Sequence, residues 1–185
     1  MGRKRRIDRA AVIEVAAQLV DEIGVTHLSL APVAERLGVR VPSLYNHIAG
    51  LEDLQLGIVA YSIEHLRNGI LDAIIGKSSD DAVLALFAAY RTYARTHPGC
   101  YNLLNALTTI EHPDLLEKAH PLTYMIAAVL SAYNLHEEDA VHAVRALRCM
   151  VHGFVTLELA GGFGLPLDLD ETYRRLTELF IAGLH

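Results

Sequence analysis

Residues 28–54 read LSLAPVAERLGVRVPSLYNHIAGLEDL, and this segment predicts how the N-terminal part of the chain folds. Ser29 is a good N-cap for a short helix that should run to Leu37, with Gly38 directly after its end. A tight glycine corner then leads into a second short helix, predicted over Val41–Ile48. Two short helices joined in this way are typical of a helix-turn-helix unit, whose second helix can enter the major groove of DNA.

The side chains around this second helix suit contact with DNA. Leu44 and Ile48 are four residues apart, so both should face the protein core. The N-terminal end of the helix, where side chains reach base edges, carries Arg40, Val41, Pro42 and Ser43. Hydrogen bonds toward phosphates are expected from Tyr45, Asn46 and His47, and the predicted DNA contacts also include Ser29.

Helical periodicity continues along the rest of the chain, so the sequence predicts an all-α fold. Before the helix-turn-helix unit, apolar residues recur at three- and four-residue steps over residues 8–24. After it, the predicted helices cover residues 51–70, 80–96, 100–108, 114–134, 137–160 and 171–184. Pro121 is expected to kink or split one of these helices, and Asp170 is expected to cap the last one.

The charge is divided unevenly along the 185 residues, which are enough for one large domain or two small ones. The whole chain has a net charge of -6. Residues 1–50 nevertheless hold seven Lys or Arg and five acids, a net charge of +2, and the remainder carries -8. A basic N-terminal part followed by an acidic remainder indicates that the N-terminal part contacts an anionic partner.

Composition also indicates where the protein works. Two cysteines, Cys100 and Cys149, are too few for a disulfide framework, so a reducing, cytoplasmic location is expected. Charged or polar residues interrupt each apolar run before the roughly 18 residues that a membrane span needs. No apolar signal-peptide core follows the basic N-terminus, because Asp8 and Arg9 come directly after Ile7.

The segment Leu28–Leu54 resembles the DNA-binding segment of the TetR family of bacterial transcriptional regulators. The similarity lies in the capped helix, the Leu-Gly-Val corner, the Pro-Ser-Leu-Tyr-x-His run and the Glu-Asp-Leu opening of the next helix. The resemblance implies a three-helix helix-turn-helix DNA-binding domain over residues 1–50. It also implies a helical ligand-binding and dimerisation domain over residues 51–185.

Two positions depart from the family pattern. Leu51 stands where the family usually carries a lysine that meets a phosphate, and Arg40 stands where it often carries a capping Ser or Thr. The basic run at the N-terminus is expected to reach along the DNA backbone or into a neighbouring minor groove, and it consists of Arg3, Lys4, Arg5 and Arg6. The alternative for this run is a solvated tail without a partner.

The run RCMVHGFVTLE at residues 148–158 resembles the C-terminal domain known as the WHG type, although Val151 replaces the tryptophan that names it. In the TetR family the last two long helices form the dimer interface. The resemblance therefore implies a homodimer with apolar contacts from Val144, Leu147, Val151, Val155, Leu159, Leu176, Leu179 and Phe180. The alternative for each of these residues is a buried core within one chain.

Aromatic, methionine and leucine residues in the second half of the chain could line a mostly apolar effector pocket. They are Phe87, Tyr90, Tyr93, Tyr101, Leu104, Leu107, Tyr124, Met125, Met150 and Phe154. The same residue types at helical spacing fit an ordinary core equally well. No cofactor and no metal site are expected, because the histidines form no i, i+4 pair within one predicted helix.

These patterns favour a ligand-responsive regulator, in the simplest case a repressor that binds a palindromic operator as a homodimer and is released by a small, largely apolar effector. An enzyme is the competing class, but neither Cys100 near His97 nor Cys149 near His152 has a third, orienting residue. A third hypothesis keeps the fold without an operator and makes the protein an interaction module, which Leu51 in place of lysine would suit.

Overall fold

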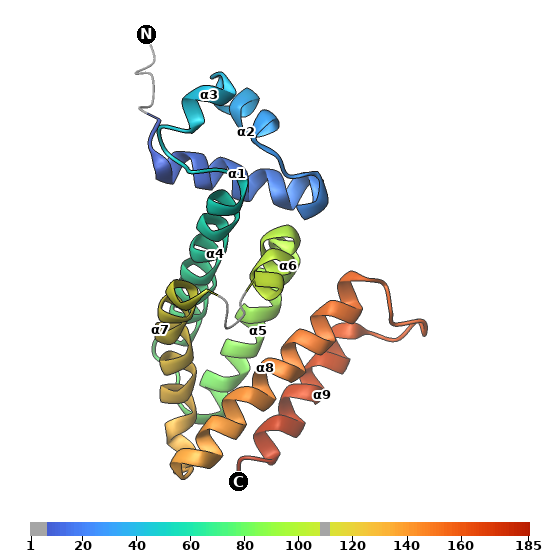
Figure 1. The fold of residues 1–185 in the computed structure, drawn as a ribbon. Helices are drawn as coiled ribbons and strands as arrows, with labels where there is room; N and C mark the ends of the chain where they lie inside the picture. Colours follow the sequence, from blue (N-terminus) through green and yellow to red (C-terminus); the bar gives the residue numbers. More distant parts are fainter. Residues whose placement is uncertain (1–6, 108–111) are drawn as a thin grey trace. The chain divides into compact units, whose positions relative to one another are not determined.

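The computed structural model describes residues 7–107 and 112–185, and every regular element in these ranges is helical, which confirms the all-α prediction (Figure 1). The N-terminal helices are α1 (Arg9–Ile23), the 3-10 helix η1 (Val25–His27), α2 (Leu30–Leu37) and α3 (Val41–Leu44). The remaining helices are α4 (Leu51–Ile74), α5 (Ser79–Thr96), α6 (Pro98–Leu107), α7 (Pro113–Leu130), the 3-10 helix η2 (Ser131–Tyr133), α8 (Glu137–Leu159) and α9 (Leu169–Ala182). None of these helices is long and apolar enough to cross a membrane.

The chain divides into two compact units. The first combines the described residues of 1–64 with those of 97–118, and the second combines residues 65–96 with residues 119–185. Helix α6 therefore belongs to the same unit as the helix-turn-helix, although the whole of α5 lies between α4 and α6 in the sequence. The domain division at residue 50 stays a prediction, and each unit is described separately below.

A left-handed glycine makes the corner of the helix-turn-helix. Gly38 has a φ angle of 68°, which a residue with a side chain adopts only with strain. Its N–H donates to the carbonyl of Glu35, and the N–H of Val39 donates to the carbonyl of Ala34, both at 3.0 Å. This pair of bonds satisfies the last carbonyls of α2 and directs the chain into α3.

Helix α6 approaches the backbone of α1 closely at Gly99. A Cβ atom at this position would lie 2.0 Å from the carbonyl oxygen of Val20, so only glycine fits. Asp21 holds the same contact, because its carboxylate accepts a hydrogen bond of 2.8 Å from the backbone N–H of Cys100. The other carboxylate oxygen lies 2.8 Å from Nδ1 of His97. Asp21 of α1 thus caps the first turn of α6 from a different helix.

Aromatic side chains form the core of the second unit, where α5, α8 and α9 pack together. The Phe87 ring of α5 lies 5.2 Å from the Phe180 ring of α9, measured between centroids. Tyr173 of α9 lies 4.8 Å from Phe154 of α8, and its hydroxyl donates a 2.8 Å hydrogen bond to the carbonyl of Phe87. These contacts join the three helices at one point and fill the space between them.

Several predicted helix features differ from the structure, and three of them have a clear physical reason. Helix α3 ends at Leu44 instead of Ile48, because the next N–H groups bond three residues back and tighten the chain into a turn. Helix α7 continues through Pro121, whose exposed position lets water reach the carbonyl that proline leaves unpaired, and the predicted split does not occur. Helix α9 begins at Leu169, and its cap is Asp168, which accepts from the N–H of Asp170 at 2.9 Å.

Candidate nucleic-acid interface

Helix α3 and the turn after it are anchored by buried residues and carry an exposed side. Leu44 is fully buried and Ile48 is 3% exposed, as their spacing predicted. Tyr45, directly after Leu44, is 57% exposed. The other predicted DNA contacts around α3 are exposed at Arg40, Pro42, Ser43 and Asn46 and partly exposed at Val41 and His47. The first unit therefore presents these side chains on its surface.

An ion pair that the sequence patterns did not indicate holds the end of this segment. The Arg9 guanidinium donates to both carboxylate oxygens of Asp53 at 2.7 Å, and also to the backbone carbonyl of His47 at 3.1 Å. Asp53 accepts a further bond of 2.8 Å from the N–H of Ala49. The hydrogen bonds from Arg9 lower the pKa of Asp53 to about 2. The start of α1, the turn after α3 and the start of α4 are thereby tied together.

Ion pairs also neutralise part of the positive charge on the surface of the first unit. Arg36 makes two hydrogen bonds to the carboxylate of Glu22, at 3.0 and 2.6 Å, and Arg9 is occupied by Asp53. Within residues 7–54, Arg40 is the arginine that forms no ion pair with another described residue. The predicted contacts Arg3, Lys4, Arg5 and Arg6 lie outside the described residues.

Ser29 is exposed at the N-cap position of α2. Its backbone has the extended conformation of an N-cap, but its hydroxyl makes no capping hydrogen bond within the described chain. Capping of α2 therefore does not occupy this hydroxyl, which is compatible with the predicted contact to a phosphate.

The predicted effector residues are divided between the two units. Tyr101, Leu104 and Leu107 belong to the first unit, and the other seven belong to the second. Phe87, Tyr90, Tyr101, Leu104 and Phe154 are buried, whereas Tyr93, Leu107, Met125 and Met150 are partly exposed. Tyr124 is 71% exposed on α7. Phe87 and Phe154 pack within the aromatic core described above, and the role of the whole set in ligand binding stays a prediction.

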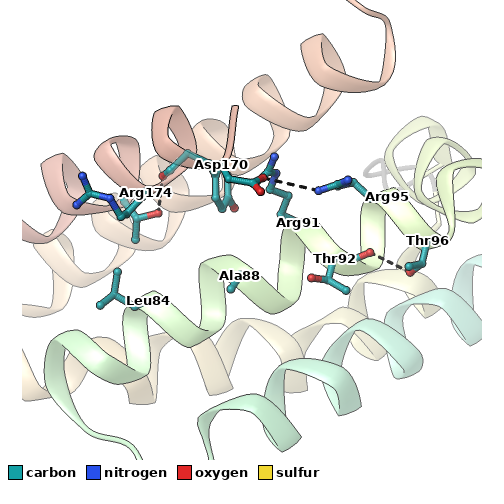
Figure 2. Close-up of a pocket in the computed structure, with 10 residues that line it drawn as sticks. Leu84, Ala88, Arg91, Thr92, Arg95, Thr96, Asp170 and Arg174 are labelled. Atoms are coloured by element: carbon teal, nitrogen blue, oxygen red, sulfur yellow. Dashed lines mark hydrogen bonds and ion pairs between the residues drawn. The ribbon is translucent and has the colours of Figure 1, made fainter. Parts of the chain in front are cut away.

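A groove of about 580 Å³ lies in the second unit, between α5 and α9. Its lining consists of Leu84, Ala88, Arg91, Thr92, Arg95 and Thr96 of α5 with Asp170, Tyr173, Arg174 and Thr177 of α9 (Figure 2). None of the ten predicted effector residues is among them. In the sequence, the signal for this site is a pair of arginines four residues apart, Arg91 and Arg95. This spacing does not identify the acidic residues with which they pair.

Arg91 is the centre of an ion-pair network at one end of this groove. Its Nε and Nη2 donate to Glu158 of α8 at 2.9 and 2.6 Å, and its Nη1 lies 2.8 Å from Asp170 of α9. The guanidinium also lies over two rings, 5.2 Å from the Phe154 centroid and 4.8 Å from that of Tyr173. One buried cation thus connects α5, α8 and α9.

The predicted dimer contacts divide into buried and exposed residues. Leu147, Val151 and Val155 have no exposed surface in the single chain, and Phe180 is 6% exposed. These four belong to the core of the second unit, which fits the alternative of a buried core within one chain, and their part in a dimer stays a prediction. The predicted contacts that keep exposed surface are Val144, Leu159, Leu176 and Leu179.

The helix-turn-helix of the first unit and the all-helical second unit define the class of two-part helical DNA-binding regulators. Comparison with known proteins identifies the family. Residues 83–180 match a family model described as a tetracyclin repressor-like C-terminal domain. An uncharacterized HTH-type transcriptional regulator from Mycobacterium tuberculosis is 31% identical over 185 residues, which are all of this chain and 84% of that protein. The chain belongs to the TetR family of transcriptional regulators.

Solved structures show the same fold. A protein of unknown function from Rhodococcus sp. RHA1 superposes with a TM-score of 0.81 at 20% identity, covering 99% of this chain and 96% of that one. A variant of TetR from Acinetobacter baumannii, solved in complex with minocycline, has a TM-score of 0.72 at 21% identity, and the match covers 96% of both chains. The matching family model describes a tetracyclin repressor-like C-terminal domain and does not name the WHG type, so the WHG type stays a prediction.

Proposed function

We propose that the protein is a ligand-responsive repressor that binds a palindromic operator as a homodimer and leaves it when a small effector binds. The observation that supports this proposal is the exposed side of α3. The side chains predicted to contact DNA are at the surface there, on a segment that buried Leu44 and Ile48 anchor in the core. The family membership supports the same function. The complex of a TetR variant from Acinetobacter baumannii with minocycline supports a small-molecule effector.

In this proposal, α3 enters the major groove and divides its contacts into two kinds. Val41 and Ser43 at its N-terminal end read base edges, whereas Tyr45 and His47 contact phosphates. Two copies of α3 in a dimer would meet half-sites that are about 34–36 Å apart, or a multiple of this distance. An effector releases the DNA only if it binds more tightly to the state in which this separation no longer matches.

The DNA-binding part is tested by selecting duplexes from a random pool and then measuring affinity for the selected sequence and for a scrambled one at several salt concentrations. A repressor should prefer the selected palindrome and lose affinity for both sequences as salt rises. Salt-dependent binding without a sequence preference would contradict an operator-specific role. An absence of DNA binding would favour the interaction module instead.

Matched variants separate the two kinds of contact. Tyr45→Ala should weaken binding to all sequences by a similar factor, whereas Ser43→Ala should change the preferred bases. Leu51 is 37% exposed and stands where the resemblance to the TetR family implies a lysine. Leu51→Lys should therefore strengthen binding to every sequence and steepen its salt dependence by about one unit per site. Unchanged base preference in Ser43→Ala would count against base reading at that position.

The dimer would use the sides of α8 and α9 that the single chain leaves exposed. Leu179 of α9 is 70% exposed and Leu157 of α8 is 49% exposed. Cys149 is exposed on α8, two residues before buried Val151 and therefore on nearly the opposite side of the helix. The face of α8 that carries Cys149 is therefore the one that could meet a second copy.

Sedimentation of two aspartate variants tests this interface. Leu179→Asp should produce folded monomers, because it places a charge in the proposed contact and leaves the core unchanged. Val151→Asp should instead unfold the second unit, because it buries a charge without a partner. A Leu179→Asp protein that remains dimeric would place the interface elsewhere. Wild-type protein that is monomeric at all concentrations would exclude the dimer.

Cross-linking through Cys149 gives an independent check of the same interface. The other cysteine, Cys100, is buried, and this burial raises the pKa of its thiol to about 12, so it should not react. A short bis-maleimide should therefore join two chains only through Cys149, and Cys149→Ser should abolish the product. Cross-linking that persists in the variant would mean that the thiol of Cys100 becomes accessible.

A further inference from the structure

In the groove between α5 and α9, an exposed carboxylate forms an ion pair with a buried arginine. The Arg91 side chain is only 10% exposed, whereas the Asp170 side chain beside it is 76% exposed. Arg95 is 53% exposed, and its Nη1 lies 3.9 Å from the same Asp170 oxygen. Figure 2 shows Arg91, Arg95 and Asp170 together at one end of the groove, with Leu84 at the other end and Ala88 between them.

We propose that this groove binds an anionic amphiphile, whose carboxylate takes the place of the Asp170 carboxylate on Arg91 and Arg95 and whose apolar tail lies along α5. The inference deepens the proposed function by naming a ligand site and ligand class in the second unit. It depends on that function only for the consequence of binding, because binding itself is measured without DNA.

The ligand carboxylate can replace that of Asp170 without leaving a buried charge unpaired. Arg91 keeps two hydrogen bonds to Glu158, whose side chain is 12% exposed, so the buried cation is never left without a partner. Asp170 is largely solvated already, so its carboxylate loses little when it turns away from Arg91 into water. One carboxylate then replaces another, and the net charge on the two arginines and their partners is unchanged.

The shape of the groove favours a ligand with a tail over a small inorganic anion. Along α5 the lining continues from the arginines past Thr92 and Ala88 to Leu84, and on the α9 side it includes Tyr173, Arg174 and Thr177. Arg95 and Leu84 are separated by about 16 Å of helix at about 1.5 Å per residue, a distance that an extended acyl chain can follow. The small side chain of Ala88 keeps the middle of this path open.

Binding of decanoate to the full chain, measured by isothermal titration calorimetry without DNA, tests the proposal. Wild-type protein should bind decanoate and should bind the uncharged analogue decanol at least about tenfold more weakly, since decanol lacks the charge-assisted bonds. Arg95→Gln should weaken decanoate binding about tenfold for the same reason. Asp170→Asn should strengthen it by a similar factor, because the variant removes the competing charge.

Two further variants test the position of the tail and provide a control. Ala88→Phe should abolish binding by filling the path of the tail, while the ion pairs remain in place. Arg175→Gln removes a cation from α9 that is 71% exposed and does not line the groove, so decanoate affinity should stay within about twofold. Circular dichroism melts confirm that each variant is folded.

The opposite effects expected at Arg95 and Asp170 distinguish a built site from nonspecific uptake of an apolar chain. Equal affinity in Arg95→Gln, Asp170→Asn and wild type would overturn the proposal, and so would equal binding of decanoate and decanol. No binding by either wild type or Asp170→Asn would also overturn it. None of these results would affect the operator test, which uses α3 variants and DNA alone.

Discussion

Replacing Arg91 by methionine should cost the second unit about 3 kcal/mol of unfolding free energy. Methionine can keep much of the apolar contact that the arginine side chain makes with Phe154 and Tyr173. It removes all the hydrogen bonds to Glu158, however, and Glu158 is only 12% exposed. The main cost is therefore a carboxylate that remains buried without its partner.

The magnitude follows from what can replace the lost cation. Removing one partner of a buried ion pair typically costs about 3–5 kcal/mol. Arg95 already lies 3.9 Å from a Glu158 oxygen and can move closer, so we expect a value near the lower limit. For a chain of this size, about 3 kcal/mol corresponds to a decrease in melting temperature of about 6–12 °C.

A double-mutant cycle with Glu158→Gln isolates this effect. The single change Glu158→Gln should cost only about 1 kcal/mol, because Arg91 keeps Asp170 and gains the amide oxygen as an acceptor. Adding Glu158→Gln to Arg91→Met should restore at least half of the lost stability, since no unpaired charge is then buried. Urea unfolding followed by circular dichroism measures all four proteins. Strictly additive costs, or a cost below about 1 kcal/mol for Arg91→Met alone, would refute the reasoning.

Two further predictions concern the first unit. Because Arg9 lowers the folded-state pKa of Asp53 from 3.8 to about 2, the pair stabilises the protein above about pH 4, and this stability is lost as the pH falls toward 2. Arg9→Gln should therefore lower the free energy of unfolding by about 1 kcal/mol at pH 7, a value reduced because both groups are partly exposed. In urea unfolding, the difference in this free energy between wild type and variant should shrink below pH 4. A difference that stays constant with pH would contradict this prediction. Gly99→Ala should destabilise the unit by about 1–3 kcal/mol, because its Cβ would meet the Val20 carbonyl at 2.0 Å. The control Gly69→Ala lies in open space on the part of α4 that belongs to the second unit, and it should instead stabilise the protein by about 0.5–1 kcal/mol. Equal effects of the two changes would exclude a close approach at Gly99.

The helix-turn-helix could be predicted because its determinants are neighbours in the sequence. Gly38 and Val39 end α2 through bonds to carbonyls three and five positions earlier, and the predicted end at Leu37 matches the structure. The burial of Leu44 and Ile48 followed from their spacing of four residues. Where a boundary depends on the turn that follows, as after Leu44, periodicity alone extended α3 too far.

The pairing of charges could not be predicted in the same way, because it depends on tertiary contacts. Arg9 and Asp53 are 44 residues apart, and Arg91 and Glu158 are 67 residues apart. In the sequence, Arg9 counts as one more positive charge in a basic head. In the folded first unit its charge is matched by Asp53, so Arg40 contributes more of the charge that the described surface offers to DNA.

The dimer residues show a related limit of sequence patterns. An apolar stripe on a helix predicts that the stripe is covered, but its period is the same whether the cover belongs to the same chain or to a second one. Val151 and Val155 are covered by their own chain, whereas Leu179 is not. The small and polar residues around Cys149 carry no strong apolar signal, although they occupy the side of α8 that remains exposed. A contact surface between copies can therefore be found only after the intramolecular core has been subtracted, which is why the exposed leucine, and not the buried valines, is the informative position to mutate.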